Sequence, residues 1–141
     1  MTEIAKANEI VLAHYSLLDG ARTEQLTGAL AEHSHSECKY HFVHPSNDVS
    51  GPAQAAHVFW NPIRESFSPL QCRQNIFMAG RNHLDNGHGV WVVSMGHFLC
   101  DWTRFWLGVK PSMKTTFVPY VAWYRIVEGA IVETVGSIYY L

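Results

Sequence analysis

Residues 90–102, VWVVSMGHFLCDW, form the most informative segment of this chain. β-Branched and aromatic residues dominate it, which predicts a β-strand at about 89–101. Apolar side chains fall on both faces, which indicates a central strand that is covered on both sides. The strand nevertheless carries His97 and Asp101, and a buried imidazole needs a partner or a neutral state. We expect the face with these two side chains to be a pocket wall.

Strand patterns continue on both sides of this segment. Further strands are expected at about 37–44, 71–79, 115–127 and 130–140. Asn86-Gly87 and Glu128-Gly129 have tight-turn chemistry and lie between neighbouring strands, so they predict antiparallel pairs. The connection 102–114 is the one long loop expected, and long loops often carry function.

The N-terminal half is dominated by helical patterns. Apolar side chains recur at helical spacing over 3–18, at Ile4, Ala7, Val11, His14/Tyr15 and Leu18, and a weaker repeat covers about 23–32. A third helix is expected from Gly51-Pro52 to Ser68-Pro69. Pro62 lies inside it and is expected to kink or split it, because proline cannot donate a backbone hydrogen bond.

Helices followed by antiparallel strands indicate one α+β domain over residues 1–141. We expect a cone-shaped, curved antiparallel sheet wrapped around the N-terminal helices, an α+β barrel. Such a cone leaves an internal pocket between helices and sheet, which is a usual place for a small-molecule site.

The composition argues against nucleic-acid and membrane partners. The formal net charge is −2 and the lysines and arginines do not cluster, so the footprint of a nucleic-acid binder is missing. No apolar stretch is long enough to span a bilayer and no signal-peptide core begins the chain, so a cytoplasmic location is expected. The three cysteines lack metal-like spacing and are expected to be free thiols. Without a phosphate loop, dinucleotide fingerprint or zinc motif, we expect no cofactor and no metal.

From residue 44 onward the sequence resembles the SnoaL-like polyketide-cyclase family of the nuclear-transport-factor-2-like superfamily. The segments that carry the resemblance, in the family's order, are HPSNDVSGPAQAAHVFWNPI (44–63), FMAG (77–80), WVVSMGHF (91–98), DWTRFWLGVKPS (101–112) and YRIVEGAIVET (124–134). The resemblance implies a cone-shaped α+β barrel, a homodimer formed through the outer sheet face, and cofactor-free cyclase, isomerase or hydrolase chemistry. Other members only bind ligands, so the fold does not settle the activity.

Two departures from the family pattern affect the expected chemistry. SnoaL-like cyclases usually carry an aspartate on the last strand as general acid/base, and the matching position here is Tyr139. Many relatives have a glutamate on the preceding strand, where this chain has Ala122. The usual acid/base therefore cannot be carried over.

Candidate catalytic residues come from three segments. His97 is suited to general acid/base work or to hydrogen bonding a carbonyl, because an imidazole titrates near neutral pH; the alternative is a structural histidine bonded to a neighbouring strand or a dimer mate. His44 and Asp48 are expected at the pocket mouth, with Asp48 orienting His44, unless Asp48 only bonds its own turn. Tyr139 or Tyr120 is expected to hold a substrate oxygen.

Aromatic residues are the expected walls of the pocket. The candidate substrate-binding residues are Trp60, Trp106, Tyr120 and Trp123, together with Asp101 near the end of its strand. They would suit a flat, hydrophobic, partly oxygenated substrate. For any one aromatic residue the alternative is core or dimer packing, and Asp101 is alternatively a turn residue.

The sequence thus predicts a cofactor-free cyclase or isomerase that acts on a polyketide- or terpenoid-like intermediate by general acid/base catalysis in a hydrophobic pocket. Because the usual carboxylates are absent, a second mode is open, in which the pocket folds a reactive substrate by shape alone. The rival class is a non-catalytic module that binds a small molecule or another protein.

Overall fold

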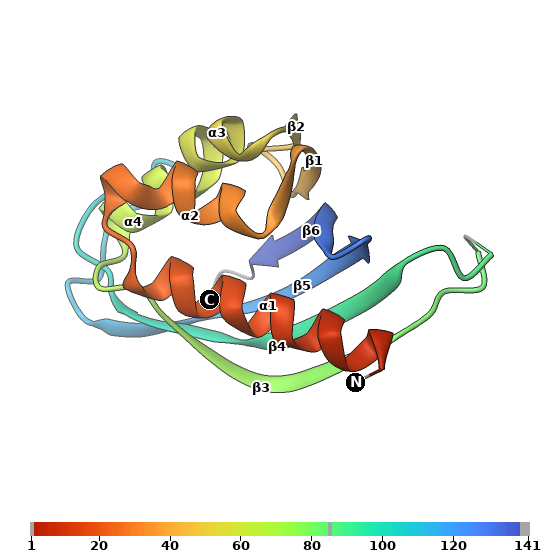
Figure 1. Ribbon diagram of the computed structural model, residues 1–141. Coiled ribbons are helices and arrows are strands. Elements are labelled where there is room, and N and C mark those ends of the chain that lie inside the picture. The colour runs from red at the N-terminus through yellow and green to blue at the C-terminus, as the bar shows by residue number, and fades with distance from the viewer. Residues whose placement is uncertain (1, 85, 139–141) are drawn as a thin grey trace.

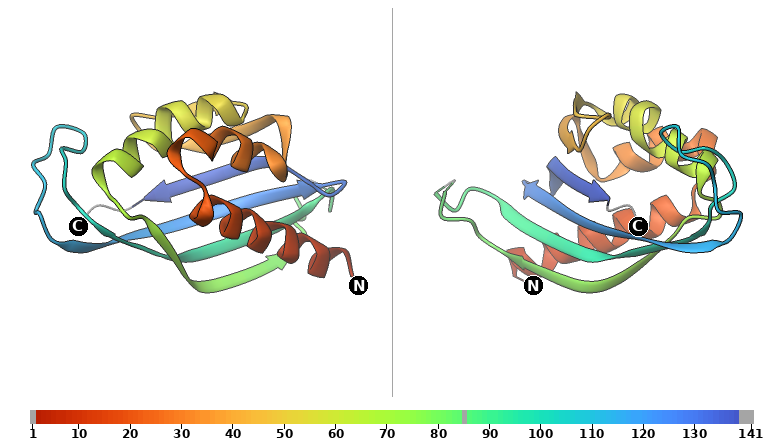
Figure 2. Two further views of the ribbon diagram at one scale, coloured as in Figure 1. Left: turned by 60° about the vertical axis from the view of Figure 1, so that its left-hand side comes forward. Right: turned by 180° about the vertical axis from the view of Figure 1, so that it is seen from behind.

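A computed structural model describes residues 2–84 and 86–138. A curved six-stranded sheet has the strand order β2-β1-β6-β5-β4-β3 (Figure 1). The helices lie together on one face of this sheet (Figure 2). In chain order the elements are α1 (Glu3–Gly20), η1 (Thr23–Gln25), α2 (Leu26–Glu32), β1 (Ser34–Phe42), β2 (Asp48–Ser50), α3 (Pro52–Ala55), η2 (Ala56–Trp60), α4 (Asn61–Ser66), β3 (Gln71–Gly80), β4 (Val90–Asp101), β5 (Thr115–Val127) and β6 (Ala130–Ile138).

The α+β class and the curved sheet are confirmed, and two details of the sheet differ from the antiparallel barrel that the sequence predicts. Strands β3 to β6 pair antiparallel, whereas β6 pairs with β1 in parallel, with Val135 opposite His41. The sheet is also open, because β2 and β3 are its two edges. A pattern of apolar residues shows that a segment is a strand but not which strand it meets, or in which direction.

The sheet bends along the pairing of β3 with β4. The pairing of these strands shifts between Gln74 and Ile76, which marks a β-bulge. Gly96 pairs with Gln74, and a Cβ added at Gly96 would lie 1.9 Å from the Arg73 carbonyl oxygen. A side chain at this position would therefore force the two backbones apart, and the bulge with its glycine gives the sheet its curvature.

The first helix buries the face that its sequence predicts. Ala7, Val11, His14, Tyr15 and Leu18 are its buried residues. The Thr2 hydroxyl accepts a hydrogen bond from the Ala5 backbone N–H at 3.1 Å, which satisfies one free donor of the first turn. At the other end the Arg64 guanidinium donates to the carbonyls of Leu18 and Ala21, so α1 is tied to α4.

The third helix is not broken at Pro62 but continues through a π-helical turn. It runs as α3, the π-helical η2 and α4. In a regular helix the backbone N–H of residue 62 would bond the Val58 carbonyl, and Pro62 has no N–H. The Ser46 hydroxyl donates to that carbonyl instead, at 3.2 Å. The extra residue of the π-turn brings Phe59 and Trp60 together to the inside of the molecule, where both line the same cavity.

Both turn predictions fall at turns, although one is part of a longer loop. Glu128 and Gly129 have positive φ angles of 50° and 79° and join Val127 directly to Ala130. Asn86 and Gly87 also have positive φ angles, of 58° and 73°, within the longer connection between β3 and β4. The short strand β2, which pairs with β1, is not anticipated by the sequence.

Candidate functional site

A cavity lies between the helices and the inner face of the sheet. Its volume is about 30 Å³, and its lining residues are His14, Tyr15, Leu30, Tyr40, Phe42, Phe59, Trp60, Phe98, Tyr120, Val121, Ala122, Tyr124, Thr134 and Gly136. A space of this size holds about two water molecules. The cavity between the helices and the sheet is therefore small, and most of its lining residues are aromatic.

A chain of aromatic rings forms one wall of this cavity. Phe42 stacks on Phe59 at 4.4 Å, and Phe59 meets Trp60 edge to face at 5.1 Å. Phe98 then meets Tyr120 at 4.9 Å. Trp60 is half-buried, whereas Phe59 is buried. Trp60 is therefore the least buried aromatic ring of the cavity lining.

Three tyrosines with hydrogen-bonded hydroxyl groups line the same cavity. The Tyr124 hydroxyl donates to the Tyr15 hydroxyl at 2.8 Å. The Tyr120 hydroxyl lies 2.8 Å from the Ser94 hydroxyl and accepts from the Cys72 thiol at 3.3 Å. Burial, the largest cause, raises the pKa of all three tyrosines well above the ordinary value. The three phenols therefore stay protonated and remain hydrogen-bond donors.

His14 is the basic side chain of the cavity lining. It lies on α1, is 3% exposed, and its Nδ1 has no hydrogen-bond partner. Burial, together with the neighbouring His33, lowers its pKa from 6.5 to about 4. The ring meets Tyr124 edge to face at 5.9 Å. His14 is therefore a neutral imidazole next to tyrosine hydroxyls, and no carboxylate is among the described residues that line the cavity.

The prediction that His97 faces the pocket is wrong. On β4 the buried residues are Val90, Val92, Ser94, Phe98 and Cys100, whereas His97 lies on the other face with Met95, which is 39% exposed. Its ring contacts Phe117 of the next strand edge to face at 5.1 Å. Both faces of this strand are apolar, so the alternation could not identify the inner one. His97 is a histidine of the outer sheet face.

Trp123 and Asp101 also lie away from the cavity. Trp123 lines a hollow on the outer face of the sheet, with Trp91 and Val93 of the neighbouring strand. Asp101 accepts a hydrogen bond from the Thr115 hydroxyl at 2.7 Å and so joins the ends of β4 and β5. The prediction that these two residues line the pocket is therefore wrong, and Asp101 fastens a strand end instead.

His44 and Asp48 do not form the expected pair. Asp48 pairs with His41 across β1 and β2, and its carboxylate lies 3.1 Å from Nδ1 of His41. Nε2 of His41 lies 3.1 Å from the Glu133 carboxylate. His44 is exposed in the turn after β1. The prediction is wrong because β2, which sets the register of Asp48 opposite His41, has too little pattern to be recognised. Neither residue lines the cavity.

Two of the predicted residues do line the cavity, namely Trp60 and Tyr120. Trp106 is buried against Phe67, at 5.7 Å between ring centroids, and fastens the loop after β4 to the third helix. It is therefore a packing residue and not a cavity wall. Tyr139 lies outside the described residues.

Sequence reasoning missed His14, Tyr15, Tyr124 and Tyr40 as site residues. A signal for the first two was present, because His14 and Tyr15 interrupt the apolar stripe of α1 with polar groups. A buried polar side chain on such a stripe has either a partner or a role.

In residues 2–84 and 86–138 there is no metal-ligating cluster and no helix that could span a membrane. No group of three or more histidine, cysteine or acidic side chains among them could hold a metal ion. None of the helices described is long and apolar enough to cross a bilayer. The three cysteines are free, as predicted.

Solved structures of similar shape come from bacteria. A protein of Jannaschia sp. CCS1 that is named as a SnoaL-like polyketide cyclase has a TM-score of 0.74 at 20% identity, covering 98% of this chain and 88% of that one. AclR of Streptomyces galilaeus, named as a hydroxylase, has a TM-score of 0.72 at 16% identity, with coverages of 96% and 80%. IdmH of Streptomyces antibioticus, named as a polyketide cyclase, has a TM-score of 0.70 at 13% identity, with coverages of 92% and 89%.

No protein-family model and no curated protein sequence matches the chain. An NTF2-like protein of Burkholderia thailandensis E264 is also similar in structure, with a TM-score of 0.66 at 12% identity over 94% of this chain and 89% of that one. Identities this low show a common fold and leave the activity open. The chain has the fold that SnoaL-like polyketide cyclases and NTF2-like proteins share.

Proposed function

We propose that the chain is a cofactor-free cyclase or isomerase that acts on a hydrophobic, carbonyl-bearing small molecule of the polyketide or terpenoid kind. The reaction takes place in the cavity between the helices and the sheet. One observation carries the proposal, namely that tyrosine hydroxyls and an unpartnered imidazole nitrogen converge on a single aromatic cavity. A largely apolar pocket with a few convergent polar groups is the usual form of a small-molecule site.

The proposed chemistry starts with the removal of a proton from the carbon next to a substrate carbonyl. His14 Nδ1 takes the proton, and the electron pair of the broken C–H bond moves onto the carbonyl oxygen. The hydroxyls of Tyr15 and Tyr120 are the donors suited to that oxygen. A base with a low pKa suffices where hydroxyl donors stabilise the enolate.

The enolate then has two possible fates. Attack on a second carbonyl carbon of the same molecule forms a carbon–carbon bond and closes a ring, and the new alkoxide takes the proton back from His14. Return of the proton to a different carbon gives an isomer instead. In both cases His14 ends the cycle neutral, so no cofactor or added oxidant is needed.

The cavity has a volume of about 30 Å³, which is too small for a polyketide- or terpenoid-like molecule. The cavity must therefore enlarge before such a substrate can enter. Trp60 is half-buried at the edge of the aromatic wall, and its outward rotation is the proposed opening step. A π-turn is a frequent feature of helices at functional sites, which agrees with a mobile wall here.

The test is a comparative metabolite profile in a host that lacks the gene. The host would express the wild type, His14→Gln, Tyr120→Phe or His97→Ala, with each protein checked for folding. We expect a precursor to accumulate without the gene and to be cleared by the wild type and by His97→Ala, because that side chain lies on the outer face. Clearance by His14→Gln should fall at least about a hundredfold, the lower end of general-base effects.

Other outcomes would separate the alternatives. Full activity of both His14→Gln and Tyr120→Phe would rule out this proton transfer and favour catalysis by shape alone. Loss of activity in His97→Ala alone would contradict the choice of cavity. A metabolite profile that does not respond to the gene would favour a protein that binds a ligand without converting it.

We also propose a homodimer formed through the outer face of the sheet. Apolar side chains are unusually exposed there: Ile76 (47%), Met78 (57%), Met95 (39%) and Phe117 (53%). A contiguous apolar face favours association with a second copy. Met95→Lys should shift the wild-type dimer to a monomer in sedimentation velocity, whereas Leu12→Lys, at a 44% exposed site on the helical side, should not. A wild-type monomer would contradict the proposal.

A further inference from the structure

A chain of hydrogen-bonded side chains runs beside the cavity, and Ser94 lies at its centre. Ser94 is on the inner face of β4, is 0% exposed, and its Oγ lies 2.8 Å from the Tyr120 hydroxyl. The Ser94 hydroxyl is also hydrogen-bonded to Tyr15. At one end of the chain the Tyr124 hydroxyl donates to the Tyr15 hydroxyl at 2.8 Å. At the other end the Cys72 thiol donates to the Tyr120 hydroxyl at 3.3 Å.

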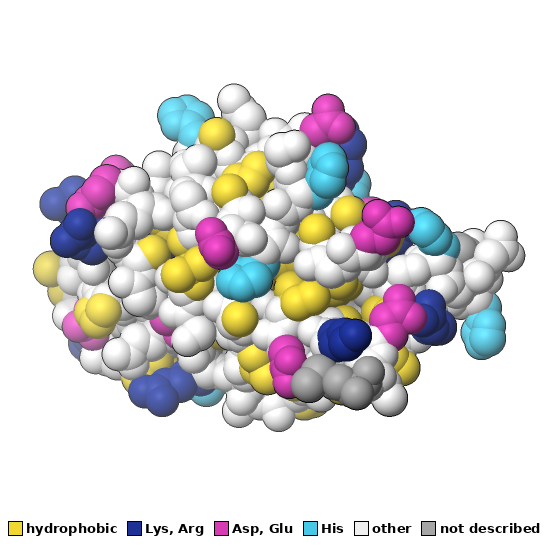
Figure 3. All heavy atoms as spheres, viewed as in Figure 1, with side chains coloured by type: hydrophobic (Ala, Val, Ile, Leu, Met, Phe, Trp, Pro, Cys, Tyr) yellow, Lys and Arg dark blue, Asp and Glu magenta, His cyan; other side chains and the backbone are white. Residues whose placement is uncertain are grey.

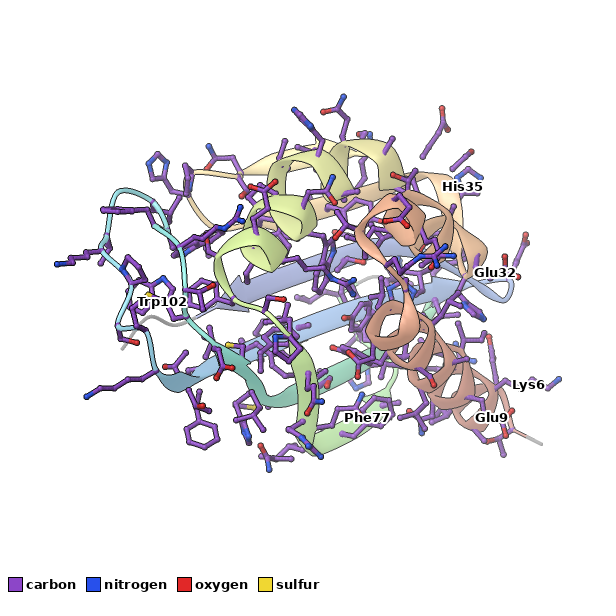
Figure 4. The ribbon with its side chains drawn as sticks, turned by 90° about the vertical axis from the view of Figure 1, so that its left-hand side faces the viewer. Lys6, Glu9, Glu32, His35, Phe77 and Trp102 are labelled. Carbon is purple, nitrogen blue, oxygen red and sulfur yellow. The ribbon has the colours of Figure 1, made fainter. Side chains whose placement is uncertain are left out.

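The helices and the sheet keep water away from this hydroxyl chain. Its three tyrosines are at most 5% exposed, and the thiol at its end belongs to a half-buried residue. Seen from the helical side, side chains close over the sheet (Figure 3). Phe77 packs against the core on the same strand as Cys72 and lies between that strand and α1 (Figure 4). The groups of the chain must therefore satisfy one another or face the cavity.

The hydroxyl chain has one proton more than its internal hydrogen bonds use. Each of the five groups carries a single proton, and four hydrogen bonds join them in a row. Both end groups donate inward. No other side chain or carbonyl among the described residues accepts a hydrogen bond from this row. One proton on Tyr15, Ser94 or Tyr120 therefore remains for a partner that the protein itself does not supply.

The chemistry of these three groups places the free proton on Tyr120. Ser94 does not line the cavity, so a free proton there would be buried without an acceptor. Tyr15 accepts from a phenol, whereas Tyr120 accepts from a thiol, which is a weak donor. Hydrogen bonds polarise one another along a chain, so Tyr15 is the better donor to Ser94. The Ser94 proton then goes to Tyr120, which accepts two hydrogen bonds and keeps its own proton for the cavity.

We infer that Ser94 is a positioning residue that turns the free proton of Tyr120 into the cavity. Its donated hydrogen bond fixes the Tyr120 oxygen and carries the polarisation that begins at Tyr124. Tyr120 then holds the substrate oxygen, and Tyr15 acts through Ser94. A donor fixed in advance in a dry site stabilises developing negative charge without reorienting. The inference rests on the proposed function, since it decides which of two tyrosines holds the oxygen.

Neutron diffraction from deuterium-exchanged crystals of the wild type tests the proton arrangement directly. We expect the Tyr15 deuteron to point at Ser94, the Ser94 deuteron at Tyr120, and the Tyr120 deuteron into the cavity. A Tyr120 deuteron that points at Ser94 would overturn the inference. No ligand is needed, so this result is independent of the proposed function.

A ketone probe tests the donor in solution. The probe is cyclohexanone with carbon-13 at the carbonyl, because a hydrogen bond to the ketone oxygen moves this resonance downfield. We expect the resonance of the bound ketone to lie further downfield in the wild type than in Tyr120→Phe. Binding to Tyr120→Phe should be at least about fivefold weaker, the effect of one neutral hydrogen bond. A larger loss in Tyr15→Phe than in Tyr120→Phe would contradict the choice of donor.

Variants of Ser94 test its positioning role. Ser94→Ala should weaken ketone binding by about twofold and move the carbonyl resonance part of the way to its position in Tyr120→Phe. Ser94→Thr keeps the hydroxyl and should restore both values. Ser66→Ala is the matched control, because Ser66 is also buried but donates to the Phe105 carbonyl, at 2.7 Å, and does not line the cavity. A thermal melt checks that every variant is folded.

The failures of the two proposals give different results. If the ketone binds and Ser94→Ala changes its resonance no more than Ser66→Ala does, Ser94 is only structural and the inference is wrong, while the cavity remains a binding site. If the ketone does not bind, the proposed function fails, and the neutron result still decides where the free proton lies.

Discussion

The buried imidazole of His14 makes the stability of this fold depend on pH, and His14→Phe is expected to remove that dependence. In the folded chain burial, aided by His33, lowers the pKa of His14 from 6.5 to about 4. Between these two values the unfolded chain binds a proton at this position and the folded chain does not. The free energy of unfolding therefore decreases as the pH falls from about 6.5 to about 4, and stays level below that.

The magnitude follows from the two pKa values. The gap between 6.5 and about 4 corresponds to about 3 kcal/mol, at roughly 1.4 kcal/mol per pH unit. No discount for solvent is needed, because the side chain is 3% exposed. For a small domain this is a large part of the total stability, so the wild type is expected to be markedly less stable in mild acid than at neutral pH.

The assay is urea unfolding, followed by far-UV circular dichroism, at several pH values between neutral and about 4. The wild type should lose about 3 kcal/mol more than His14→Phe over this range, because all other titrating groups are common to both proteins. His57→Ala, an exposed histidine on the third helix, should keep the wild-type slope. At neutral pH the variant should be at least as stable as the wild type, since it removes a buried nitrogen that has no partner. Equal slopes for His14→Phe and the wild type would refute the reasoning.

Three further predictions concern the scaffold. Gly96→Ala should destabilise the fold by about 3 kcal/mol or more, or prevent soluble expression, because its Cβ would overlap a backbone carbonyl; Gly80→Ala, in open space, should be nearly neutral in the same urea unfolding. Ser46→Ala should lower the free energy of unfolding by about 1 kcal/mol in the wild type, because the Val58 carbonyl loses its donor. In a Pro62→Ala background the loss should be much smaller, because residue 62 then has a backbone N–H for that carbonyl. Equal losses in this double-mutant cycle would contradict the role of Ser46. Arg64→Met should lower the thermal midpoint by several degrees, about 2 kcal/mol, because two carbonyls of the α1 terminus lose a charged donor; an unchanged midpoint would show that water replaces it.

The elements of this fold were predictable because their signals are local. Glu128-Gly129 specifies a two-residue turn whichever sheet it joins, and the predicted helix over 3–18 and strand over 115–127 agree with α1 and β5 to within two residues. The parallel pairing of β1 with β6 was not predictable in this way. It joins residues far apart in sequence, and neither strand contains a residue that specifies the direction of its partner.

The position of Asp48 shows that a very short strand cannot be recognised from its sequence pattern. Strand β2 has three residues, too few for alternation to be visible, so the sequence of this segment predicts a loop. Pairing with β1 nevertheless places Asp48 opposite His41 and not beside His44. The sequence predicts His44 and Asp48 as partners because they lie four positions apart on one loop. The backbone register, which the sequence does not reveal, gives Asp48 a different histidine.

The location of the cavity follows from which face of β4 is the inner one. Alternation separates the two faces of a strand, but it identifies the inner one only where one face is polar. On β4 both faces are apolar, and the more conspicuous polar residue, His97, lies on the outer one. The inner face instead carries Ser94, a small hydroxyl that is 0% exposed and pairs with Tyr120. A central strand tolerates a histidine on a partly exposed face at little cost, whereas a fully buried serine requires a partner. The smaller polar group on such a strand was therefore the better guide to the cavity, and it leads to Tyr120, Tyr15 and the neutral imidazole of His14.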